Sequence, residues 1–197
     1  MLKFAIILTS AALGLSCHVM AEEHRELGAH EHGHGTLNVA VEGNVLKMEL
    51  EVPGDDIVGF EHDPSTQEEK AAMESAKKSL ADPLNLFKIP DAAKCSVREA
   101  KVSIREEKHE DGGAAAKGGA KKDDAKKHDE PEAHHNEFFV EYTLDCKAAG
   151  EVKTMNFNYF KVFKKGEELN VSVITPKGAT KFEVTRDKPE ISLAGLM

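Results

Sequence analysis

The sequence predicts an α+β fold: antiparallel β-hairpins, a few helices, one disulfide and a long disordered insertion rich in His, acidic and Lys residues. Three observations predict it. Alternating apolar segments flank short turns at residues 43–44 and 176–178. A stretch ending at Leu80 has apolar residues at helical spacing, and residues 106–135 contain no large apolar side chain. The 197 residues, 40% of them hydrophobic, suffice for one core.

The chain begins with a predicted signal peptide, residues 1–21. Lys3 supplies the positive region, residues 4–15 form an apolar stretch too short to span a membrane, and Val19-Met20-Ala21 is a small-residue cleavage site. The mature chain is then exported and starts at Glu22. The alternative is a lipoprotein anchored to a membrane through Cys17.

Two cysteines, Cys95 and Cys146, remain after the signal peptide is removed. An even pair in an oxidising compartment predicts a disulfide. It would close a loop for which the chain-entropy model gives about 4 kcal/mol of stabilisation. Ligation of a metal by the two thiolates is the alternative, but the cysteines lie far apart and no CxxC motif is present.

The first half of the mature chain predicts a hairpin and a helix. Residues 36–41 and 45–52 alternate apolar and polar around Gly43-Asn44, which is typical of a β-hairpin. Residues 55–64 form a loop. Ser65 or Thr66 can cap a helix, with Glu68 completing a capping box with Ser65, and this helix ends at Leu80 before Asp82-Pro83. Residues 84–89 form an apolar turn or short helix over the core.

The rest of the ordered chain continues the β pattern. Residues 95–104 predict a strand whose inward parity shifts at Arg98-Glu99, as a β-bulge would cause. The remaining expected elements are a strand at 138–146, a short amphipathic helix at 155–163, a hairpin at 169–173 and 182–184, and an edge segment after Pro189.

Residues 106–135 differ sharply in composition from their surroundings. The segment combines Gly, Ala, Lys and Asp, so it cannot bury enough surface to order itself. We expect a disordered loop inserted into one domain that comprises residues 22–105 and 136–197. Such a long loop is usually functional or a linker.

Four of the ten histidines fall within residues 24–35. His30, His32 and His34 alternate with other residues, so on an extended backbone their imidazoles point to one side. Zinc needs three or four converging donors and accepts neutral imidazole, which makes this cluster, with His24 in support, a candidate metal site. The alternative is an unstructured His tract near the mature N-terminus.

Other histidines extend the candidate set. His62, beside Glu61 and Asp63, arrives from the loop after the first hairpin, although it could instead be a surface histidine bonded to Asp63. The insertion carries four further histidines near acidic residues, which we expect to be weaker ligands unless they are chance members of a charged linker. They are His109, His128, His134 and His135.

Charge and motifs exclude several functions. A formal net charge of −9 argues against nucleic acid as a partner and favours divalent cations. A mean hydropathy of −0.44 excludes a polytopic membrane protein. The sequence contains no HExxH, GxSxG or Gly-rich phosphate loop, so we expect no enzyme; a zinc hydrolase is the enzymatic alternative. A further alternative is a transporter adaptor that docks through residues 84–89.

Several stretches resemble the ZrgA-type periplasmic zinc uptake proteins of Gram-negative bacteria. They are AHEHGHGTLNVAVEGNVLKMELEVPGDDIVGFEH, DPLNLFKIP, AKC and ITPKG. The resemblance implies a periplasmic Zn²⁺-binding component that works with an ABC-type or outer-membrane zinc uptake system. It carries over His30, His32 and His62; His34 is additional to the HxHG pattern, so its role stays open. The insertion resembles the His-rich internal loop of these proteins in composition, but not residue by residue.

The resemblance also selects the metal. Imidazole with carboxylate suits Zn²⁺, Cu²⁺ and Ni²⁺ alike, and only the likeness to zinc uptake proteins favours zinc. We expect the loop to concentrate zinc near a tighter ordered site. Because ligating imidazole must be neutral, zinc should be lost below the ordinary histidine pKa of about 6.5. The sequence predicts no oligomeric state.

Overall fold

The computed structural model describes residues 31–107 and 135–197. The expected signal peptide, Cys17, and all but the two ends of the expected insertion lie outside these ranges. Within them the fold is α+β, with antiparallel hairpins, helices and a disulfide, as the sequence predicts.

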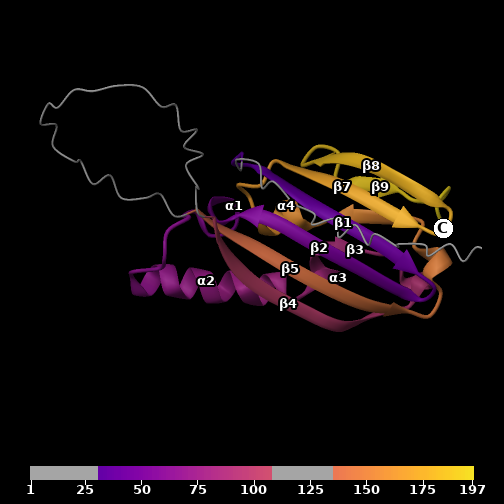
Figure 1. Ribbon diagram of the computed structural model, residues 1–197, viewed down its shortest axis with the longest axis horizontal. Helices are drawn as coiled ribbons and strands as arrows, with labels where there is room; N and C mark the ends of the chain where they lie inside the picture. The colour runs from indigo at the N-terminus through magenta and orange to yellow at the C-terminus, as the bar shows by residue number, and fades with distance from the viewer. Residues whose placement is uncertain (1–30, 108–134) are drawn as a thin grey trace, which may run out of the picture.

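A six-stranded sheet organises the molecule (Figure 1). All neighbouring strands are antiparallel except β1 and β7, which are parallel. The two predicted hairpins are confirmed as β1–β2 and β7–β8, whereas the parallel pair that joins them is not among the sequence expectations. In spatial order the strands are β4 (Cys95–Glu107), β5 (His135–Cys146), β2 (Val45–Pro53), β1 (His34–Glu42), β7 (Glu168–Thr175) and β8 (Gly178–Thr185).

One face of this sheet is apolar because side chains alternate along each strand. Leu37, Val39 and Val41 on β1 are buried while Asn38 and Glu42 face outward or lie at the edge. The neighbouring strands keep the same parity in register, since Leu37 pairs with Leu50 and Val39 with Met48. A one-residue slip would turn all these side chains toward solvent, so the apolar pattern fixes the register.

A second layer covers the apolar face. Phe87 packs edge-on against Tyr142 of the large sheet and Phe157 of the small one, and the Tyr142 hydroxyl donates to the Leu80 carbonyl at 2.8 Å. The layer contains α2 (Gln67–Leu80), α3 (Pro83–Leu86), α4 (Tyr159–Val162) and a small sheet of β3 (Phe87–Lys88), β6 (Thr154–Phe157) and β9 (Glu190–Ser192), besides the 3₁₀ turns Asp91–Ala93 and Ala149–Glu151.

The apolar residues of the segment 84–89 pack in or against the core. Leu86 and Phe87 are fully buried. The alternative in which this segment is an exposed docking patch is therefore not supported. The predicted edge segment after Pro189 is confirmed as β9.

The predicted helix is confirmed as α2, and its cap is Thr66, one of the two residues expected there. The capping box, however, lies one residue later than expected. The Thr66 hydroxyl accepts a hydrogen bond from the Glu69 N–H at 3.1 Å, and the Glu69 carboxylate accepts one from the Thr66 N–H at 3.0 Å. The capping box therefore joins Thr66 and Glu69 rather than Ser65 and Glu68. Ser65 instead donates its N–H and its hydroxyl to Glu69.

Two local expectations are wrong. The loop expected at 55–64 opens with a short helix, α1 (Gly54–Val58), whose acidic first turn favours a helix start and which ends at Gly59, φ 90°. The helix expected at 155–163 begins as strand β6 before α4. Met155 and Phe157 are both buried, as alternate residues of a strand are. The sequence also has apolar residues three and four positions apart in this stretch, and that helical spacing led to the wrong prediction.

The pair β4–β5 carries the predicted bulge and disulfide. The register shifts between Val97 and Glu99, and Cys95 and Cys146 form the confirmed disulfide. Both sulfurs are therefore unavailable as thiolate ligands. At the other end the strands extend into the expected insertion, because Glu106 and Glu107 pair with Asn136 and His135.

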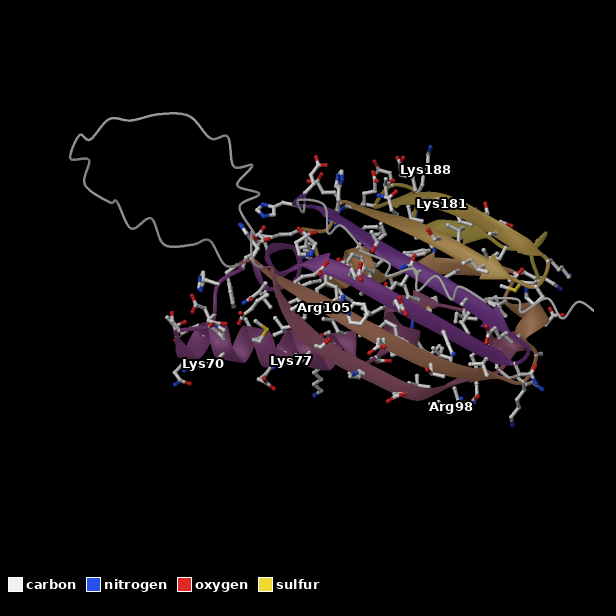
Figure 2. All side chains as sticks on the ribbon, viewed as in Figure 1. Lys70, Lys77, Arg98, Arg105, Lys181 and Lys188 are labelled. Atoms are coloured by element: carbon white, nitrogen blue, oxygen red, sulfur yellow. A yellow bond between two sulfur atoms is a disulfide. The ribbon has the colours of Figure 1, made fainter. Side chains whose placement is uncertain are left out.

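Arg105 links three strands on the outer face of the sheet. Its guanidinium lies 3.3 Å from the centroid of the Phe139 ring on β5 and 3.4 Å from Glu51 Oε1 on β2. Figure 2 shows Arg105 on the large sheet, and Lys70 and Lys77 along α2. This cation–π and ionic contact holds β4, β5 and β2 together near their insertion end.

In the described ranges no helix is both long enough and apolar enough to cross a membrane.

The disulfide gives a stability prediction. Replacing both Cys95 and Cys146 with Ser should lower the free energy of unfolding by about 2 to 4 kcal/mol, because the unfolded chain regains the entropy of the open loop. Urea unfolding followed by circular dichroism measures this. Ser96→Ala, an exposed change in the same strand, is the control. A double variant as stable as wild type would contradict the prediction.

The cap of α2 gives a prediction for acid stability. Hydrogen bonds from Thr66 and Ser65 lower the pKa of the Glu69 carboxyl from 4.5 to about 2. Ionised Glu69 therefore stabilises the fold fully above pH 4.5, and this contribution is lost as the pH falls toward 2. Glu69→Gln keeps an acceptor but cannot titrate. As the pH falls from 4.5 toward 2, the Tm of Glu69→Gln should fall less than the Tm of wild type. Glu68→Gln is the control and should behave as wild type. If the Tm of Glu69→Gln and of wild type fall equally with pH, the role of Glu69 is refuted.

Candidate metal centre

Three segments that are distant in sequence meet at one end of the large sheet. They are the turn before β1, the residues that follow α1, and the start of β5, which lie at the left of the sheet in Figure 1. The Asn136 N–H donates to the Glu61 carbonyl at 3.0 Å, and the Gly33 N–H donates to Asp56 Oδ1 at 2.8 Å. These hydrogen bonds tie the segment from 54 to 61 to both neighbours.

The Glu61 carboxylate lies between two imidazoles. Its Oε1 is 3.0 Å from His32 Nε2, and its Oε2 is 2.5 Å from His135 Nδ1. The Glu61 side chain is 13% exposed, while His32 is 61% and His135 is 37% exposed. A nearly buried carboxylate is thus flanked by two imidazoles that remain accessible from solvent.

His135 differs from its predicted role. The sequence assigns it to the mobile insertion as a weak ligand, whereas the structure has it in the first position of β5, paired with Glu107. A strand position next to a buried Asn136 is more rigid than a loop position. His135 is therefore part of the ordered cluster with Glu61.

His34 does not continue an extended row with His32. Gly33 has φ 86°, and residues 32–33 form a turn, so the expected alternation of imidazoles on one side stops there. His34 opens β1 and lies 3.5 Å from Glu31. It lines a polar cleft of about 420 Å³ together with Lys164, Glu168 and Arg186.

His62 is turned toward α2. Its Nδ1 lies 2.9 Å from the Asp63 carbonyl, its Nε2 lies 3.8 Å from Glu69, and its ring stacks on Phe60 with centroids 5.0 Å apart. Its neighbour Glu61 is the residue of the GFEH stretch that contacts His32. Ligation by His62 stays a prediction.

The other sequence-predicted ligands lie outside the described residues. They are His24, His30, His109, His128 and His134, and their roles stay predictions. Across residues 31–107 and 135–197, no three or more His, Cys, Asp or Glu side chains form a ready arrangement for holding a metal ion. The described cluster is thus a hydrogen-bonded His–Glu–His group.

Asp56 is a buried acidic residue that contacts the turn carrying His32. It is only 3% exposed, and burial raises the pKa of its carboxyl, an effect that Asp55 and Glu61 add to and that the Gly33 N–H and His32 oppose. Next to it lies Tyr159, whose hydroxyl pKa burial also raises. Lys165 forms an ion pair with Asp55 at 2.8 Å and anchors the start of α1. Sequence reasoning missed both Asp56 and Glu61.

The donor chemistry suits a borderline divalent cation. Zinc takes imidazole nitrogen and carboxylate oxygen, and two donors on a tetrahedral ion lie about 3.4 Å apart when each bond is about 2.1 Å. The His32–Glu61 separation of 3.0 Å is close to that spacing.

Comparisons with known proteins agree with this chemistry. Among curated proteins, none matches the chain. A family model described as ZrgA family zinc uptake protein matches residues 29–193. The match takes in both sheets and the end where His32, Glu61 and His135 meet, and it establishes that the chain belongs to the ZrgA family of zinc uptake proteins.

Proposed function

We infer that this chain captures Zn²⁺ as cargo in the periplasm, through His32, Glu61 and His135, and passes it to a zinc uptake transporter. The family gives the coarser role in zinc uptake. The observation that carries the finer assignment is the Glu61 carboxylate, which contacts His32 at 3.0 Å and His135 at 2.5 Å. These three residues are of types that bind zinc and come from separate segments, so only the folded chain brings them to the same end of the sheet.

A site with three protein donors suits a carrier. Structural zinc sites close all four positions with protein ligands, whereas three ligands leave a position for water or for a receiving ligand. The exposure of His32 and His135 gives a partner access to the ion. Exchange is therefore possible without unfolding the sheet.

The histidines outside the described residues extend this proposal. His30 lies two residues before His32, and His134 directly precedes His135, so both are candidate additional ligands beside the ordered group. His24, His109 and His128 would act as weak zinc ligands. Because they belong to the same chain as the ordered group, zinc bound to them would raise the local zinc concentration near that group.

The proposal is one of binding without turnover, so we infer that the chain is not an enzyme. Copper and nickel remain competing cargoes in vitro, because the same donors suit them and Cu²⁺ binds most N/O sites more tightly. Selectivity for zinc would then come from metal supply and from the receiving transporter.

Substitutions at the cluster test the site. His32→Ala, His135→Ala and Glu61→Gln should each weaken zinc binding by at least about 10- to 100-fold, since even outer-shell changes cost that much. Calorimetric titration of the mature chain measures the effect. Glu68→Gln is the control and should stay within about threefold of wild type, while His62→Ala tests the predicted ligation by His62. Unchanged affinity in all three cluster variants would remove the site assignment, and strong weakening in His62→Ala would add His62 to it.

Proton competition gives a second test. Because imidazole binds metal only when neutral, zinc affinity should fall by about tenfold or more for each pH unit below about 6. Competition with a chelator of known affinity between pH 7.5 and 5 measures this. A protein that stays fully loaded at pH 5 would argue against histidine ligation.

A further inference from the structure

The backbone beside His32 is held from both sides at Gly33. Its N–H donates to Asp56 Oδ1 at 2.8 Å. Its carbonyl accepts hydrogen bonds from the N–H groups of Glu167 and Glu168 at 2.8 and 2.9 Å. The two peptide units on either side of the Gly33 Cα are thus each hydrogen-bonded to a separate segment. This restricts the backbone next to His32 and so restricts the direction of the His32 side chain.

The geometry at Gly33 requires glycine. Its φ is +86°, and a Cβ built there would lie 3.1 Å from Glu167 Cγ. Any other residue would meet both a disfavoured backbone conformation and a close neighbour. The turn that separates His32 from β1 is thus specific in its shape.

Asp56 is itself fixed to the segments that supply the other two members of the cluster. A Cβ on Gly54 would lie 2.7 Å from the Asn136 carbonyl and 2.8 Å from the Phe60 carbonyl, so α1 starts in direct contact with the backbone next to His135 and next to Glu61. The Lys165–Asp55 ion pair at 2.8 Å holds the same turn from the other side. The turn that carries Asp56 therefore joins the segment of Gly33 to the segments of Glu61 and His135.

The burial of Asp56 needs an explanation. It is 3% exposed, and its Oδ2, like the buried Tyr159 hydroxyl, has no hydrogen-bond partner within the described ranges. A buried carboxylate that is only partly hydrogen-bonded destabilises a fold. A five-residue helix gains little that would offset this cost, which points to a role at the site beside it.

We propose that Asp56 is a positioning residue for zinc capture: its carboxylate holds the Gly33 amide and so keeps the His32 imidazole against Glu61. This inference rests on the proposed function. Asp56 does not contact the ion. It acts through His32, in the way that outer-shell carboxylates orient the imidazoles of metal sites.

A double-variant cycle tests the proposal. Asp56→Ala should weaken zinc binding by about 10- to 100-fold, whereas Asp56→Asn, which keeps an acceptor oxygen for Gly33, should stay within about threefold of wild type. In a His32→Ala background, Asp56→Ala should add less than about twofold, because a residue that acts through His32 has nothing left to position. Equal and independent losses from the two changes, or no loss from Asp56→Ala, would overturn the proposal.

A second pair of variants keeps the test decisive if Asp56→Ala does not fold. Gly33→Ala disturbs the same hydrogen bonds from the other partner and should weaken zinc binding by about tenfold or more. Gly43→Ala is the matched control, since Gly43 also has a positive φ, 58°, but a Cβ there meets nothing within 4 Å. Equal zinc affinities for Gly33→Ala and Gly43→Ala would refute the positioning role.

The same measurements separate two kinds of failure. If His32→Ala binds zinc as wild type does, His32 is not a ligand of the site and the role of Asp56 falls with it. If His32→Ala loses affinity while Asp56→Ala and Gly33→Ala keep it, the site stands and only the positioning role is refuted. Urea unfolding of each variant separates loss of zinc affinity from loss of stability.

Discussion

The contact of one carboxylate with two imidazoles, Glu61 with His32 and His135, depends on the arrangement of the whole sheet end. Glu61 is held there because its carbonyl accepts the Asn136 N–H, and His135 is held because β5 pairs with β4 and β2 in a fixed register. That register follows from the apolar alternation that faces the core. The cluster therefore forms only when the large sheet is correctly paired.

The electrostatics of this end favour exchange of cations. Glu61 and Asp56 bring two carboxylates close to His32, and the Gly33 N–H stabilises only one Asp56 oxygen. A cation bound by the imidazoles reduces the repulsion between these acids, and a proton on an imidazole does the same. Under the proposed function, protons and Zn²⁺ would compete for this group, which suits a protein that has to bind and release its cargo.

The sequence predicts the hairpins, α2, the bulge and the disulfide because each depends on local spacing or on the cysteine count. It does not predict the parallel pairing of β1 with β7, which joins residues far apart in the chain. From the GFEH stretch, sequence reasoning names His62 and not Glu61 as a candidate ligand. Nothing in these four residues indicates that the Glu61 side chain contacts His32 in the fold. It also misses Asp56, because a buried carboxylate in a five-residue helix resembles an ordinary loop acid until the fold is known.

The most direct measurement of the central claim is a crystal structure of the zinc-loaded mature chain, with anomalous scattering recorded on both sides of the zinc absorption edge. We expect an anomalous peak about 2.0 to 2.2 Å from His32 Nε2, His135 Nδ1 and a Glu61 oxygen. A peak bound only by other residues, with the His32–Glu61–His135 hydrogen bonds intact beside it, would contradict the account.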